Sequence, residues 1–76
     1  MTHHFTVTPA QRRVLEALTA TGGTDAQIGE QLGLSFETVK SHLKHVNKAA
    51  GTHTRLELAV GLWSGRLTYS ARKAGE

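Results

Sequence analysis

Three lysines spaced four residues apart are the first chemically suggestive feature of this sequence. Lys40, Lys44 and Lys48 recur within the segment 35–50. Because residues four apart lie on one face of an α-helix, the spacing predicts a basic stripe along a single helix. Such a stripe is suited to phosphate groups, but most lysine stripes are simply solvated helix faces. The elements around the stripe therefore decide its interpretation.

Two histidines in the same segment invite a metal-site interpretation. His42 and His45 lie three residues apart, but zinc sites need further ligands, and the sequence has no cysteine and no well-placed carboxylate to provide them. We therefore expect no metal and no other cofactor. Catalysis is not predicted either, because the sequence has no glycine-rich phosphate loop after a strand and no carboxylate pair in an obvious cleft.

The elements that must position the lysines are four helices. Each predicted start has a residue suited to capping, namely Thr8, Thr24, Ser35 and Thr54, and glycines follow each predicted end. The fold class is therefore predicted as all-α, a four-helix helix-turn-helix domain, with helices at about 9–20, 25–32, 36–50 and 55–64. No strand is predicted.

Apolar spacing assigns a buried face to each of the last two helices. On the helix 36–50, the inward residues are Phe36, Val39, Leu43, Val46 and Ala50. On the helix 55–64, the inward stripe is predicted as Leu56, Ala59, Val60 and Trp63. Leu58 and Leu62 fall outside this stripe, so they are either scattered exposed leucines or a dimer contact.

Length and charge set the boundaries of the domain. The chain has 76 residues, room for one domain, and nine Lys and Arg against six Asp and Glu, which alone says little about partners. We expect a flexible N-terminal tip at 1–7, the domain at 8–67 and a flexible tail at 68–76. Without a signal peptide or a membrane span, a cytoplasmic location is expected.

The segment 24–46 has the arrangement of a helix-turn-helix. A short helix, a tight turn at Gly33 and Leu34, and a longer helix capped by Ser35 follow one another, and Gly29 leaves space where the two helices approach. In this arrangement the second helix enters the major groove of DNA.

The order of these residues resembles the LuxR/GerE-type helix-turn-helix domain of bacterial transcription regulators, over roughly 7–67. The resemblance is carried by Thr8-Pro9, Arg13-Val14-Leu15, Ile28-Gly29, Leu32-Gly33-Leu34-Ser35, Thr38-Val39-Lys40-Ser41-His42-Leu43, Gly51, Thr54-Arg55-Leu56-Glu57 and Ala59-Val60. The chain departs from the family in Gln11-Arg12-Arg13, where an acidic residue is usual, and in Gly29, where alanine is usual.

The resemblance implies a sequence-specific transcription regulator that binds double-stranded DNA. Base contacts are implied for Lys40, Ser41 and Lys44, and phosphate contacts for Thr24, Gln27, Ser35, Thr38, His45 and Lys48. Family members commonly pair through the fourth helix, which implies a homodimer with Leu58 and Leu62 at its interface.

Two alternatives remain open at this point. The run Pro9-x-Gln11-Arg12-Arg13-Val14-Leu15 is also similar to the last region of a sigma factor, which would imply contact with RNA polymerase. The chain could also be a protein-interaction module that antagonises a larger regulator by pairing through the Leu58 and Leu62 face. Steep salt dependence of DNA binding would favour a DNA-binding regulator over such a module.

Overall fold

The computed structural model describes residues 2–72 and contains four helices and two short strands. They follow in the order β1 (His3–Val7), α1 (Pro9–Thr21), α2 (Asp25–Leu32), α3 (Phe36–Ala50), α4 (Arg55–Ser64) and β2 (Leu67–Ala71). The four predicted helices are confirmed, and their bounds agree with the prediction to within one residue. No helix in the described part of the chain is long and apolar enough to cross a membrane.

Local hydrogen bonds explain why α1 and α2 begin where the sequence predicts. Thr8 and Thr24 each accept a hydrogen bond from the backbone N–H three residues later. In turn, the side-chain oxygens of Gln11 and Gln27 accept a hydrogen bond from the backbone N–H of those threonines. The reciprocal pairs satisfy backbone donors that a helix start leaves without an intrahelical partner.

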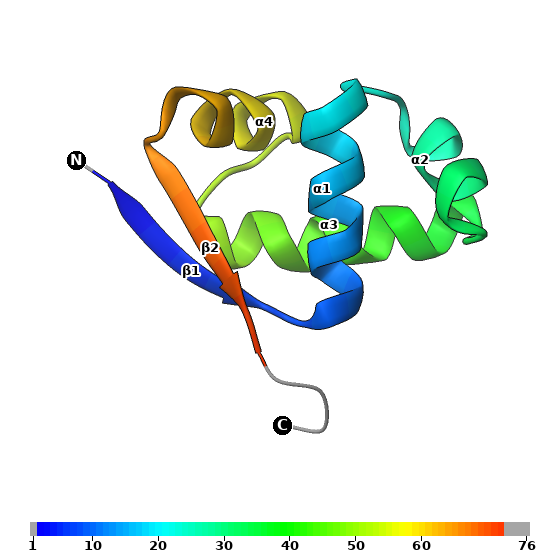
Figure 1. Ribbon diagram of the computed structural model, residues 1–76, viewed down its shortest axis with the longest axis horizontal. Helices are drawn as coiled ribbons and strands as arrows, with labels where there is room; N and C mark the ends of the chain where they lie inside the picture. The colour runs from blue at the N-terminus through cyan, green and yellow to red at the C-terminus, as the bar shows by residue number, and fades with distance from the viewer. Residues whose placement is uncertain (1, 73–76) are drawn as a thin grey trace.

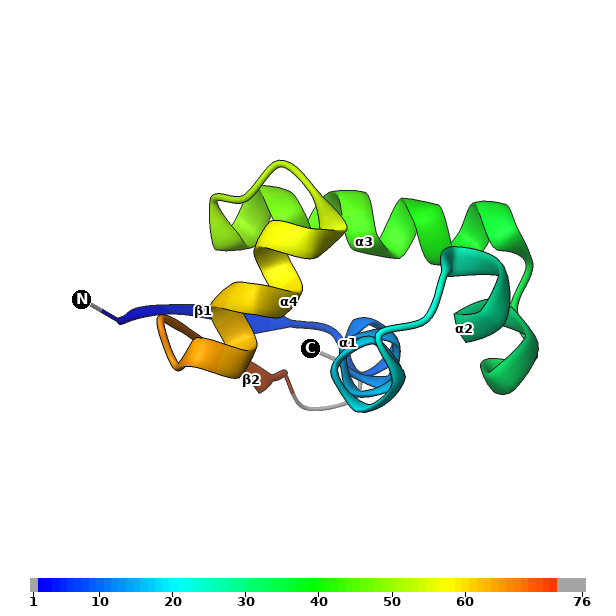
Figure 2. The same ribbon diagram turned by 90° about the horizontal axis from the view of Figure 1, so that it is seen from above.

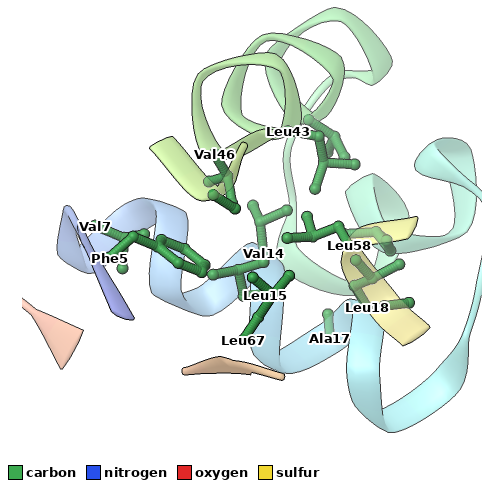
Figure 3. Packing of buried hydrophobic residues seen from close by; sticks show 14 residues of the cluster. Phe5, Val7, Val14, Leu15, Ala17, Leu18, Leu43, Val46, Leu58 and Leu67 are labelled. Carbon is green, nitrogen blue, oxygen red and sulfur yellow. The ribbon is translucent and has the colours of Figure 1, made fainter. Parts of the chain in front are cut away.

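The core lies where α1 crosses α3, with α4 and the sheet closing it (Figure 1). Figure 3 shows residues from β1, α1, α3, α4 and β2 converging on one cluster, with the Phe5 ring directed toward Val14. Val14, Leu15 and Leu18 of α1 are at most 1% exposed. A single cluster therefore holds all the layers of this small domain together.

The two ends of the described chain form a parallel two-stranded sheet, which the sequence analysis did not predict. His3 pairs with Leu67 and Val7 with Ala71. The expectation of a flexible tip and tail is therefore wrong for residues 3–7 and 68–71, whereas residues 73–76 lie outside the described part. The physical reason is packing, because Phe5, Val7 and Leu67 alternate with exposed residues and enter the core.

Side chains also join the two strands on both faces of this sheet. On the outer face, the ring nitrogens of His4 lie 2.8 Å from the Thr68 hydroxyl and 3.1 Å from the Ser70 hydroxyl. On the inner face, the rings of Phe5 and Tyr69 have centroids 5.9 Å apart. Burial, with a smaller contribution from a neighbouring carboxylate, raises the pKa of the Tyr69 phenol, which favours its neutral form.

The buried face of α4 differs from the predicted one. Leu58 is fully buried and Leu62 is half-buried against the core, so neither forms the exposed face that the predicted dimer contact requires. Leu56, Val60 and Trp63, predicted to face inward, are 69%, 39% and 56% exposed. The physical reason is that the side of α4 that carries Leu58 faces the shared core, and Leu67 of β2 packs on Gly61, one turn further along this side.

Replacing Phe5 tests whether β1 is an integral part of the domain. Phe5→Ala should lower the free energy of unfolding by about 3–5 kcal/mol, because it empties a buried aromatic site. Thr6→Ala, on the exposed side of the same strand, should change it by less than about 0.5 kcal/mol. Urea unfolding followed by circular dichroism measures both, and equally small effects would show that β1 does not pack on the core.

A second test concerns the contact between α4 and β2. A Cβ on Gly61 would collide with the Leu67 side chain, so Gly61→Ala should destabilise the domain although alanine is normally the better helix former by about 1 kcal/mol. In a Leu67→Ala background, the same change should become stabilising. Thermal unfolding of the four proteins measures this coupling, and stabilisation by Gly61→Ala in both backgrounds would contradict it.

Candidate nucleic-acid interface

The turn between α2 and α3 is built on a close backbone approach. Gly33 adopts a φ of 72°, and the Leu34 N–H donates a hydrogen bond to the Gly29 carbonyl oxygen at 2.8 Å. A Cβ on Gly29 would lie 2.6 Å from the Leu34 carbonyl oxygen. This confirms that Gly29 leaves the space expected where the helices approach, and it accounts for the departure from alanine at this position.

The first turn of α3 carries two linked hydroxyl groups. The Ser35 Oγ accepts a hydrogen bond from the Thr38 N–H at 3.2 Å, and the two side-chain oxygens are 2.8 Å apart. Ser35 is exposed and Thr38 half-buried. Hydroxyls and backbone N–H groups at a helix start are suitable donors for phosphate oxygens, and the positive end of the helix dipole favours an anion there.

The two sides of α3 have opposite characters. Val39, Leu43 and Val46 are at most 4% exposed and attach the helix to the core. The lysine stripe, Lys40, Lys44 and Lys48, is exposed, as is Ser41. Figure 2 shows α3 along one edge of the molecule, with α1, α2, α4 and both strands on its other side. The stripe is therefore accessible to a partner as large as a duplex.

Phe36 does not join the core as the sequence analysis predicts, because it is 49% exposed. It is the first residue of α3 and lies one turn before both the buried Val39 and the exposed Lys40. Phe36 therefore sits at the border between the apolar face and the lysine stripe, beyond the residues that attach α3 to the core.

The two histidines of α3 have different environments. His42 is half-buried, in agreement with its expected place at the edge of the apolar face. His45 is exposed, and its Nδ1 lies 2.9 Å from the Ser41 carbonyl oxygen, to which it donates. While Nδ1 donates to this carbonyl oxygen, a hydrogen bond from Nε2 to a phosphate needs a hydrogen on both ring nitrogens. Within residues 2–72, no three metal-ligating side chains of the His, Cys, Asp or Glu types gather.

The start of α2 presents Thr24 and Gln27 to solvent. Their hydrogen bonds use the Thr24 hydroxyl oxygen and the Gln27 side-chain oxygen as acceptors. The NH2 group of Gln27 is therefore the part of that side chain that can donate outward. This geometry suits the phosphate contact expected from the sequence.

An open groove of about 610 Å³ runs beside the lysine stripe. Its lining comes from α2, α3, the connection to α4 and the first residue of α4, and includes Asp25, Lys40, Lys44, Lys48, His53, Thr54 and Arg55. Asp25, His53 and Arg55 are members of this site that were not predicted from the sequence. In the sequence, all three residues are neighbours of the capping residues of α2 and α4, and no regular spacing connects them to α3.

One ion pair in the lining of this groove joins the starts of α2 and α4. The Arg55 Nη1 lies 2.9 Å from the Asp25 Oδ1, and the two side chains are 39% and 20% exposed. Because solvent screens a pair with this exposure, it contributes only about 0–1 kcal/mol to stability. Asp25 also lies in the first turn of α2, where the positive end of the helix dipole stabilises a negative charge.

Comparisons with known proteins agree with this geometry. Residues 6–62 match the model of a family described as bacterial regulatory proteins, luxR family. The chain is 44% identical over 41 residues to the HTH-type transcriptional activator RamA of Corynebacterium glutamicum, a match that covers 54% of this chain and 15% of the activator. No solved structure matches the chain. The chain belongs to the luxR family of bacterial regulatory proteins, which supports a role in DNA-binding transcription regulation.

Proposed function

We propose that this domain regulates transcription by placing α3 in the major groove of a specific DNA site. Lys40, Ser41 and Lys44 contact base edges there. The observation that carries the proposal is the exposed lysine stripe on a helix whose opposite side packs against the core. The match to the luxR family over residues 6–62 favours a luxR-type regulator over the sigma-like alternative, whose similarity is in the first helix and turn.

Phosphate contacts on both sides of the DNA major groove fix the position of α3 on the duplex. The start of α2 supplies one set and α3 supplies the other, and together they comprise Thr24, Gln27, Ser35, Thr38, His45 and Lys48. Their support is the hydrogen-bond geometry at the two helix starts and the exposure of His45 and Lys48. Such contacts set orientation and affinity, whereas base contacts set the sequence.

Lysine variants separate these two kinds of contact. Lys40→Ala and Lys44→Ala should each weaken binding to a site selected from random DNA by about 1–3 kcal/mol and relax the preference at one base position. Lys48→Ala should weaken binding to all sequences alike and reduce the salt slope by about one phosphate contact. Fluorescence anisotropy at several salt concentrations measures both effects.

Arg13→Ala is a matched control, because it also removes one positive charge but lies on α1, away from the lysine stripe. It should change affinity much less than the lysine variants do. Equal losses of DNA affinity in Arg13→Ala and Lys44→Ala would indicate a general charge effect. They would contradict the proposal that α3 enters the major groove of DNA.

We also propose that two copies pair through the exposed side of α4. Leu56, Val60 and Trp63 are spaced so that they form one stripe, and all three are large exposed hydrophobic side chains. The Trp63 Nε1 donates to the Thr19 carbonyl oxygen at 3.0 Å, which fixes the indole over the end of α1. Pairing of this stripe with its copy would give a two-fold dimer on two half-sites about 10 base pairs apart.

A charge in this stripe should separate the copies without unfolding the domain. Val60→Glu should remove cooperative binding to a two-half-site duplex and leave binding to a single half-site within about two-fold, because Val60 lies outside the core. Ala20→Glu, an exposed change on α1, is the control. Sedimentation of the DNA complexes gives the stoichiometry, and unchanged cooperativity in Val60→Glu would exclude this interface.

A further inference from the structure

The first residue of α3 is an exposed aromatic side chain beside the lysine stripe. Phe36 is 49% exposed, and its chain neighbours Ser35 and Glu37 are exposed polar residues. The other large hydrophobic side chains exposed in the described part of the chain all lie on α4. Because single exposed hydrophobic residues are common on protein surfaces, the position of Phe36 must decide whether it has a role.

The packing at the start of α3 does not depend on Phe36. An apolar residue before a helix cap often packs against the fourth residue of the helix, and these positions are held by Leu34 and Val39. Val39 is fully buried, and Leu34 packs against the core cluster. The Ser35 side chain caps the helix by accepting a hydrogen bond from the Thr38 N–H. The helix start is therefore complete without the Phe36 ring.

Phe36 lies at the N-terminal end of the lysine stripe. It precedes Lys40 by four residues, just as Lys40 precedes Lys44, so the three side chains follow one another along the helix surface. Figure 1 shows α3 beginning beside α2, at the opposite end of the molecule from the sheet. In a helix-turn-helix, the first residues of the second helix reach base edges. Phe36 would therefore enter the major groove together with the lysines.

We propose that Phe36 is a specificity-determining residue that packs against the 5-methyl group of a thymine in the major groove. The proposal rests on the placement of α3 proposed above. The thymine methyl is the one methyl group that unmodified base pairs present in this groove, and apolar side chains such as phenylalanine contact it. The contact removes apolar surface of both the ring and the methyl group from water, which is favourable.

The same ring disfavours the other bases at this position. Where thymine has its methyl group, cytosine has only a hydrogen atom and a purine has its N7 acceptor. With cytosine the ring loses the methyl contact. Over a purine it covers N7 without offering a hydrogen bond, which is unfavourable. Phe36 therefore adds a preference for thymine to the preference for guanine that is typical of lysine.

The spacing on α3 also predicts where this thymine lies. Four residues separate Phe36 from Lys40, which corresponds to about 6 Å along the helix axis. Successive base pairs are about 3.4 Å apart along the duplex. The thymine should therefore lie within about two base pairs of the base that Lys40 contacts.

Removing the methyl group from the DNA tests the proposal without changing the protein. In a site selected from random DNA, deoxyuridine, which lacks only the 5-methyl group, replaces one thymine at a time. A replacement within about two base pairs of the position at which Lys40→Ala relaxes the preference should weaken binding about 4-fold, the equivalent of about 0.8 kcal/mol for one buried carbon group. Replacements at the other thymines are the controls and should change the affinity by less than about two-fold. Fluorescence anisotropy measures the affinities.

Variants of Phe36 connect the methyl effect to this side chain. Phe36→Ala should bind the selected duplex more weakly and should bind its deoxyuridine form equally well, because nothing is left to contact the methyl group. Phe36→Leu keeps an apolar side chain and should retain part of the discrimination. Thermal unfolding checks that both variants are folded. A methyl effect of the same size in Phe36→Ala as in the unmodified protein would overturn the proposal.

The remaining outcomes separate this proposal from the placement of α3. If Lys44→Ala binds like the unmodified protein, α3 is not in the groove, and the role of Phe36 is rejected with it. Loss of affinity in Lys44→Ala without any methyl-sensitive thymine rejects the role of Phe36 alone. Equal weakening of all sequences by Phe36→Ala would assign the ring to the DNA backbone and would also refute the thymine contact.

Discussion

The packing of α3 against the core is the interaction on which the rest of the domain depends. Val39, Leu43 and Val46 occupy the centre of the cluster, and α1 crosses the helix at this point. A helix held along one side has no rotational freedom, so the direction of its lysines is fixed by the same contacts that stabilise the fold. In a domain this small, a cavity under α3 would therefore alter both stability and the orientation of the site.

The helices and the lysine stripe could be predicted because their signals are local. A threonine or serine cap and a following glycine specify each helix within a few residues, and the spacing of Lys40, Lys44 and Lys48 needs only the helical period. The groove could not be predicted in the same way. Asp25 and Arg55 are 30 residues apart, and only the packing of α2, α3 and α4 brings them together.

The face of α4 and the two strands could not be predicted because their signals depend on distant partners. Leucine, valine, alanine and tryptophan occur all around α4, so periodicity alone cannot choose its buried side. That choice depends on β2, whose Leu67 packs on Gly61. β2 in turn is stabilised by β1, at the other end of the described chain. Two five-residue strands pair in isolation only marginally, so neither sequence alone indicates a sheet.

The parallel pairing of β1 and β2 also determines how the domain would respond to mechanical force. His3 pairs with Leu67 at one end of the ladder, and Val7 pairs with Ala71 at the other. A pull on the first residue of β1 and the last residue of β2 therefore acts at opposite ends of the pair. The force is directed along the strands and loads the interstrand hydrogen bonds together in shear, whereas an antiparallel hairpin pulled at its ends would open one bond at a time. Because the sheet connects the two ends of the described chain, the domain should resist stretching more strongly than its four short helices alone would.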